Sequence, residues 1–162
     1  MEKKIRRGVR CHLIKDGYII CTKYALDSNI RYGWFDIPGG RIEDGENAYE
    51  ACIREFKGKT GMDVTDLINK GNIILEYPDR IYEFSAFFAR GYRGQPGNFK
   101  ENTSCWINID ELLSSDKIVS NIFVLNKFFL KSFLNNNNTF TLHLLVDDNE
   151  NILNIDYTLN KY

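Results

Sequence analysis

The chain has 162 residues, of which 43% are hydrophobic, and its formal net charge is -1 at pH 7. This length and composition predict a single globular domain and exclude an intrinsically disordered chain. The near-neutral charge gives no reason to expect binding to a nucleic-acid backbone or to an acidic membrane, although a small phosphorylated ligand needs only a local site.

The few cysteines and histidines do not form a zinc-binding pattern. Cys11, Cys21, Cys52 and Cys105 are nowhere spaced as Cys-x-x-Cys, so a zinc site is not expected. A disulfide between Cys11 and Cys21 across a hairpin is a minor alternative to four reduced thiols. The N-terminus lacks the apolar run of a signal peptide, and no later stretch is apolar for long enough to span a bilayer. We therefore expect a cytoplasmic protein.

The first half of the chain alternates strand-like runs with one helical segment. In order, it predicts a hairpin over 7–24, a polar loop over 25–33, a short strand over 34–38 and a helix over 46–60. The hairpin turn is indicated by Lys15-Asp16-Gly17, and the helix is bounded by Gly45 and Gly61.

The second half contains more strands and a second helix. The predicted elements are strands over 72–77 and 80–90, a loop from 91 to 103, a strand over 104–109, a helical turn at 110–113, a helix over 117–134, a hinge at 135–138 and a hairpin over 139–159. Strands mixed with two substantial helices predict an α/β domain with a mixed sheet. We divide the chain into a domain over 1–134 and a C-terminal extension over 135–162, a hairpin packed on the same domain.

The most specific pattern lies between residues 39 and 62. It matches G-x5-E-x7-R-E-U-x-E-E-x-G-U, where U is a bulky apolar residue, at Gly40, Glu46, Arg54, Glu55, Phe56, Gly61 and Met62. In this pattern the chain resembles the Nudix (MutT-like) hydrolase family. A strand ending in Ile-Pro-Gly-Gly before the pattern, and Glu101, Trp106 and Glu111-Leu112 after it, are also similar to the family. The resemblance covers roughly residues 5–133 and implies an α/β/α sandwich with a mixed sheet.

The resemblance also implies a chemistry, namely cleavage of a diphosphate by water attack at phosphorus, assisted by Mg²⁺ or Mn²⁺. These hard cations take oxygen ligands, and acids one turn apart on a helix can converge on them. The resemblance assigns Glu46 and Arg54 to an ion pair that orients the helix. It assigns Glu55 to the metal and the attacking water, and Glu101, from a distant loop, to metal binding or base catalysis.

Two positions depart from the family pattern, because Gly58 and Lys59 stand where the family has acids. Lys59 follows Glu55 by four residues, which favours a salt bridge on a solvated helix face. The alternative is that Lys59 binds a phosphate of the substrate and replaces part of the charge of a metal. Either interpretation predicts weak metal binding and slow turnover.

Other candidate binding residues flank this helix. The backbone of Gly39 or Gly40 is a further expected contact for metal or phosphate, since glycine permits close approach, although both residues also suit a simple turn. Trp34 is a candidate for stacking on a nucleobase, with core packing as the more common role of such a residue. The same two interpretations apply to Phe35, Tyr82 and Phe99, while Arg31, Arg80 and Arg90 are candidate phosphate partners or solvated cations.

Two functional hypotheses follow. The leading hypothesis is a hydrolase that cleaves the diphosphate bond of a nucleoside diphosphate linked to another group, because Glu46, Arg54, Glu55 and Glu101 all remain. The second, favoured by the missing acids, is a catalytically impaired nucleotide-binding or protein-interaction module on the same fold. The expected partner is a small nucleotide-type ligand, with no nucleic acid and no membrane, and the C-terminal extension is compatible with a homodimer.

Overall fold

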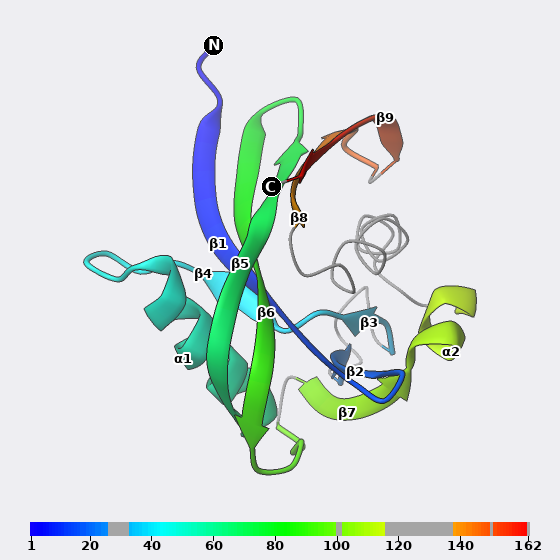
Figure 1. The fold of residues 1–162 in the computed structure, drawn as a ribbon. Coiled ribbons are helices and arrows are strands. Elements are labelled where there is room, and N and C mark those ends of the chain that lie inside the picture. The colour runs from blue at the N-terminus through cyan, green and yellow to red at the C-terminus, as the bar shows by residue number, and fades with distance from the viewer. Residues whose placement is uncertain (26–32, 100–101, 116–137, 150, 162) are drawn as a thin grey trace.

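The computed structural model describes residues 1–25, 33–99, 102–115, 138–149 and 151–161 (Figure 1). The predicted helix over 117–134, the predicted ligand Glu101 and the candidate cation Arg31 lie outside the described residues.

The described chain forms a mixed sheet with two helices. The elements are β1 (Lys4–Lys15), β2 (Tyr18–Tyr24), β3 (Phe35–Asp36), β4 (Gly39–Arg41), α1 (Ala48–Thr60), β5 (Asp63–Glu76), β6 (Arg80–Arg93), β7 (Asn102–Asn108), α2 (Ile109–Ser114), β8 (Asn138–Val146) and β9 (Ile152–Lys161). The sheet order is β3-β2-β1-β6-β5-β8-β9, and β4 pairs with β1 while β7 pairs with β2. The β1–β6 and β5–β8 pairs are parallel. The predicted mixed α/β fold is confirmed.

Strand β1 organises the centre of this sheet. It pairs in parallel with β6 over residues 4–13, in antiparallel fashion with β4 over 8–10, and with β2 near its C-terminal end. The predicted turn between β1 and β2 is present. Asp16 and Gly17 have φ angles of 51° and 81°, the left-handed pair that a two-residue hairpin turn requires.

Helix α1 begins at Ala48, two residues after the predicted start, because Asn47 caps it. The Asn47 side chain accepts a hydrogen bond from the Glu50 backbone N–H, and the Glu50 carboxylate accepts one from the Asn47 N–H. This reciprocal pair satisfies two free donors at the helix start. Gly61 ends the helix in the left-handed conformation at φ 76°. The helix buries Ala51, Cys52, Phe56 and Thr60 and lies across one face of the sheet (Figure 1).

Two strands differ from the prediction. The strand expected over 72–77 begins at Asp63 as β5, because exposed polar residues such as Thr65 and Asn69 conceal its first half. The alternative that Gly39 and Gly40 merely make a turn is wrong, because Gly39–Arg41 forms β4. There Gly39 pairs with Arg10, and an added Cβ at Gly39 would overlap the carbonyl oxygen of Val9. Glycine therefore permits the close strand contact.

Two hydrophobic cores lie on the two sides of the sheet. One includes Ile73, Phe140 and Leu142, and the other includes Phe56 and Phe87 below α1. Strand β8 continues the sheet beyond β5, so the C-terminal hairpin contributes Phe140 and Leu142 to the first core. Cys11 and Cys21 belong to different cores, and all four cysteines are unpaired. The alternative of a disulfide between Cys11 and Cys21 is therefore wrong.

His12 makes the stability of the fold dependent on pH. Complete burial lowers the pKa of His12 to about 4, although its hydrogen bond with the Phe87 carbonyl opposes the shift. The unfolded chain, with a pKa of about 6.5, binds the proton first as the pH falls. We therefore expect the free energy of unfolding to fall by about 2 kcal/mol between about pH 7.5 and about pH 5 from this group.

Urea unfolding of the wild type and of His12→Gln at the two pH values checks this expectation. The His12→Gln variant should lose much less unfolding free energy than the wild type between about pH 7.5 and about pH 5, whatever its stability at about pH 7.5. An equally steep loss in the variant would show that other groups govern the pH dependence.

Candidate functional site

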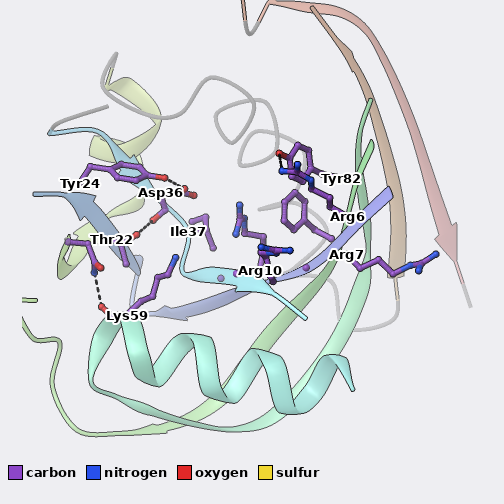
Figure 2. Close-up of a pocket in the computed structure, with 15 residues that line it drawn as sticks. Arg6, Arg7, Arg10, Thr22, Tyr24, Asp36, Ile37, Lys59 and Tyr82 are labelled. Carbon is purple, nitrogen blue, oxygen red and sulfur yellow. Dashed lines mark hydrogen bonds between the residues drawn. The ribbon is translucent and has the colours of Figure 1, made fainter. Parts of the chain in front are cut away.

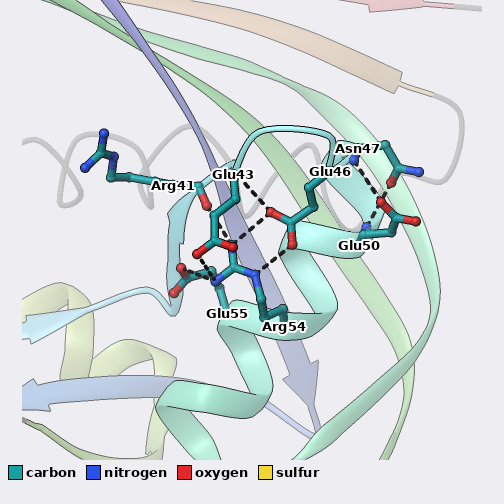
Figure 3. Close-up of polar contacts among 7 residues, drawn as sticks. All are labelled: Arg41, Glu43, Glu46, Asn47, Glu50, Arg54 and Glu55. Atoms are coloured by element: carbon teal, nitrogen blue, oxygen red, sulfur yellow. Dashed lines mark hydrogen bonds and ion pairs between the residues drawn. The ribbon is translucent and has the colours of Figure 1, made fainter.

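The guanidinium of Arg54 is the centre of a cluster of ion pairs at the start of α1 (Figure 3). Its Nε and Nη2 donate to the two oxygens of Glu46 at 2.7 and 2.9 Å. Its Nη1 donates to Oε1 of Glu55 at 2.8 Å, and Nη2 also donates to the Arg41 carbonyl at 2.9 Å. A planar guanidinium suits this bidentate geometry. Arg54 thus joins the helix to the loop that precedes it.

Two members of this cluster, Glu46 and Arg54, stabilise each other's charged forms. The hydrogen bonds from Arg54, together with the backbone N–H of Glu43, lower the pKa of Glu46 to about 2. Glu46 and Glu55 in turn raise the pKa of Arg54. Glu46 is therefore committed to Arg54 as an orienting partner, and it is poorly suited to accept a proton or bind a metal.

Glu55 lies beside the backbone of β4. Its side chain is 18% exposed, and one oxygen of its carboxylate accepts the hydrogen bond from Arg54. An added Cβ at Gly40 would overlap the Glu55 carboxylate. Gly40 thus lets the carboxylate lie directly against the strand, at the edge of a cleft lined by Arg41, Glu43 and Lys59.

Gly58 and Lys59 have different environments. Gly58 is exposed and an added Cβ would meet open space. Lys59 is half-buried and lines the Glu55 cleft. Among the described residues Lys59 forms no ion pair, and Glu55 pairs with Arg54 instead. The expected Glu55–Lys59 salt bridge is therefore wrong, and the Lys59 ammonium is available to a ligand.

The described residues do not provide a set of ligands for several metal ions. Within the described ranges, no group of three or more His, Cys, Asp and Glu side chains is placed to hold a metal. Glu46 and Glu55 are both hydrogen-bonded to Arg54, and Glu50 caps the helix. Glu43 and Asp44 also line the cleft, but Glu43 pairs with Arg54 at 3.7 Å, so few of the described carboxylates remain to hold a metal. The positively charged side chains that line the cleft are those of Arg41 and Lys59.

A cavity of about 510 Å³ adjoins the Glu55 cleft, a size typical of sites for small molecules. The cavity and the cleft share Gly40, Arg41 and Lys59. The Asn102 side chain donates to the Lys59 carbonyl at 2.9 Å and fixes the end of α1 against β7. Figure 2 shows Lys59 directed from the helix toward the cavity. A ligand in the cavity would therefore reach Glu55 past the Lys59 ammonium.

Asp36 contributes an unpaired acceptor to the cavity wall. Its Oδ2 accepts a hydrogen bond from the Tyr24 hydroxyl at 3.0 Å. Its Oδ1 is buried and has no hydrogen-bond partner among the described residues. A buried acceptor without a partner is costly, so Oδ1 would gain from an N–H or O–H donor, which it can meet in the cavity only if the carboxylate turns, because Oδ1 is shielded from solvent.

The aromatic candidates are divided between the core and the cavity. Trp34 and Phe35 pack against the first core and do not line the cavity. Tyr82 lines the cavity, whereas Phe99 is exposed and lies against Gly61. The interpretation of Trp34 as a stacking platform is not supported by its position.

The arginine candidates have local partners. Arg90 pairs with Asp66 at 2.9 Å, and Arg80 pairs with Asp79 at 2.7 Å while its guanidinium lies over the Tyr77 ring. The cavity instead contains Arg6 and Arg10 of β1. A signal for these two residues was present in the sequence, because positions 6, 8 and 10 of a strand share one face.

Comparison with known proteins agrees with this arrangement. The model of the NUDIX domain matches residues 4–125. An 8-oxo-dGTP diphosphatase from Proteus vulgaris is 30% identical over 98 residues, which are 59% of this chain and 85% of that protein. An 8-oxo-dGTP diphosphatase from Escherichia coli (strain K12) is 24% identical over 114 residues, which are 70% of this chain and 88% of that protein.

Solved structures show the same fold. The crystal structure of the MutT protein from Bacillus halodurans superposes with a TM-score of 0.78 at 20% identity and covers 96% of this chain and 97% of that one. The chain therefore belongs to the NUDIX family, as a MutT-like Nudix hydrolase. Members of this family generally use divalent metal ions.

None of the helices in the described part of the chain is long and apolar enough to cross a membrane.

Proposed function

We propose that this hydrolase cleaves the diphosphate bond of a nucleoside diphosphate linked to another group. The proposal rests on the junction between the cavity and the Glu55 cleft, both of which are lined by Gly40, Arg41 and Lys59. A nucleoside in the cavity would place its phosphate chain at this junction. The names of the two diphosphatase relatives support a nucleotide substrate.

In this proposal each residue has a separate role. Lys59 and Arg41 neutralise the diphosphate by contacts with its oxygens. Glu55 accepts a proton from the attacking water, whose oxygen bonds to phosphorus while the bond from phosphorus to the bridging oxygen breaks. Arg54 and Glu46 hold Glu55 in position and do not touch the substrate. The Asp36 carboxylate, which lines the cavity, accepts a hydrogen bond from the nucleoside.

Glu101 and the backbone of Gly39 and Gly40 complete the proposed site. Glu101 keeps the role that the family resemblance implies, as an additional acid for metal binding or base catalysis. We expect Mg²⁺ or Mn²⁺ to bind weakly, because Glu43 and Glu55 in the cleft both pair with Arg54 and few described carboxylates are free to bind it. We also propose a cytoplasmic location, which the four unpaired cysteines support.

Nucleotide or phosphate release from nucleoside triphosphates, nucleotide sugars, ADP-ribose and dinucleoside polyphosphates tests the proposal. The reactions are run with Mg²⁺, with Mn²⁺ and with a chelator. We expect slow turnover of at least one of these classes, with saturation only at high metal concentration. Binding of nucleotides without turnover of any substrate would replace the proposal with a nucleotide-binding module on the same fold.

The contribution of Lys59 is measured with Lys59→Gln. Loss of its ammonium should raise KM about tenfold, since a charge-assisted contact with phosphate contributes about 1.5 kcal/mol or more. Lys57→Gln is the matched control, because Lys57 is exposed on the same helix and pairs with Asp63 away from the cavity. Equal KM values for the two variants would remove Lys59 from the binding site.

A further inference from the structure

The cavity carries more positive charge than one diphosphate requires. Among the described residues its lining includes Arg6, Arg7, Arg10, Arg41 and Lys59 but only one acid, Asp36. The chain as a whole has a net charge of -1, so this concentration of cations is local. Arg41 and Lys59 lie at the junction with the Glu55 cleft. The arginines of β1 form a separate group, farther from Glu55.

Arg6 and Arg10 line one wall of the cavity at two levels. They lie on the same face of β1, about 13 Å apart along a strand that rises about 3.3 Å per residue. Gly8 lies between them, where an added Cβ would meet the Gly40 carbonyl and the Phe84 ring. Figure 2 shows Arg6 beside Tyr82 on one side of the cavity, Asp36 beside Tyr24 on the other, and Arg10 between them.

Aromatic rings, rather than acids, hold these two arginines. The Arg10 guanidinium lies 4.3 Å from the centre of the Phe84 ring, and Arg6 donates to the Tyr82 hydroxyl at 3.1 Å. The rings of Tyr82 and Phe84 are parallel, with centres 6.0 Å apart. Arg10 also donates from Nη1 to the Val9 carbonyl at 3.4 Å, so each guanidinium uses one nitrogen in a hydrogen bond and has further N–H groups that can contact a ligand.

The neighbouring Arg7 shows the contrast. Its Nε donates to Glu83 at 3.2 Å, so its charge is balanced locally. Among the described residues Arg6 and Arg10 have no carboxylate partner in an ion pair. Uncompensated arginines that converge on a cavity favour an anionic ligand, and phosphate matches the guanidinium geometry well.

We propose that Arg6 and Arg10 form a second anion subsite, and that the preferred substrate carries a phosphoryl group separate from the scissile diphosphate. This inference deepens the proposed function, because it assigns a substrate class to the same cavity. The diphosphate lies at Lys59 and Arg41, the nucleoside contacts Asp36, and the additional phosphoryl group lies between Arg6 and Arg10.

Binding of adenosine 3′,5′-bisphosphate and of 5′-AMP, measured by titration calorimetry in the presence of a chelator, tests the subsite without any catalysis. The two probes share base, sugar and 5′-phosphate, so an unsuitable base weakens both equally. We expect the bisphosphate to bind at least tenfold more tightly. Arg6→Gln and Arg10→Gln should each remove most of this ratio and leave 5′-AMP binding within about twofold.

Two further variants control for charge and folding. Lys4→Gln removes one positive charge from β1 outside the cavity lining and should preserve the tenfold ratio. Arg10→Lys keeps the charge and should retain part of the ratio, which separates lost charge from altered packing against Phe84. Equal binding of the two probes by the wild type, or a ratio unchanged in both Arg→Gln variants, would overturn the subsite.

The outcome is independent of the test of hydrolysis. Absence of turnover with preferential binding of the bisphosphate would refute the hydrolysis reaction and keep the subsite. Turnover of a simple nucleoside triphosphate, with equal binding of the two probes, would keep the proposed function and refute the second phosphoryl group.

Discussion

Glu55→Gln should reduce kcat about 1,000-fold while leaving the fold intact. The amide has nearly the shape of the carboxylate, and its oxygen can still accept the hydrogen bond that Arg54 donates at 2.8 Å. It cannot accept the proton of the attacking water, and a well-placed general base commonly accelerates a reaction by about 100-fold to 10,000-fold. The loss should appear in kcat with little change in KM, because Lys59 and Arg41 bind the diphosphate.

Single-turnover measurements on the substrate identified by the panel check this result. Glu50→Gln is the matched control, since it makes the same change on the same helix. Glutamine preserves the capping interaction with Asn47, so its kcat should equal that of the wild type. Similar kcat values for Glu55→Gln and the wild type would assign the base to a residue other than Glu55.

Gly40→Ala should lower kcat/KM about 100-fold. An added Cβ would overlap the Glu55 carboxylate, so either the side chain or β4 must move. A displacement of about 1 Å at a reacting group commonly costs about 100-fold. The effect is steric, because Gly40 is not among the glycines with positive φ.

Gly58→Ala provides the control for this second substitution. Gly58 lies on α1, the helix that carries Glu55, and an added Cβ there meets open space. Activity should therefore not change, and the helix should become more stable by about 0.5–1 kcal/mol. Thermal unfolding and kinetics of both variants measure the two effects. Wild-type activity in Gly40→Ala would show that contact between β4 and Glu55 is not needed for turnover.

The flanking residues Gly45 and Gly61 predicted the position of α1 well, because the boundaries of a helix depend on local interactions. Gly61 ends the helix as expected, while the start shifted to Ala48 because Asn47 and Glu50 form a capping pair. The first half of β5 was missed for the opposite reason. Its polar residues pair with the second half of β6, from Phe87 to Arg93, which lies far along the chain from them. Such pairing leaves little local signal in the sequence.

The candidate site was predicted unevenly. The Glu46–Arg54 pair is where the family pattern implied it, since the pattern sets Glu46 just before the helix and Arg54 within it, so that the two side chains can meet. The partner of Glu55 was predicted wrongly, because a favourable four-residue spacing to Lys59 competes with a stronger contact from the adjacent Arg54. Arg6 and Arg10 were overlooked, because their role depends on the parallel pairing of β1 with β6, which brings Tyr82 and Phe84 beside them.

The position of these arginines on β1 has a consequence for the kinetics of hydrogen exchange. Over residues 8–10, β1 is paired with β4 on one side and β6 on the other. Its amide protons there should be among the slowest to exchange, because their release requires the sheet to open as a whole. A ligand that binds this wall would then order side chains but no backbone. The entropic cost of recognition would be smaller than for a loop that must fold around its ligand.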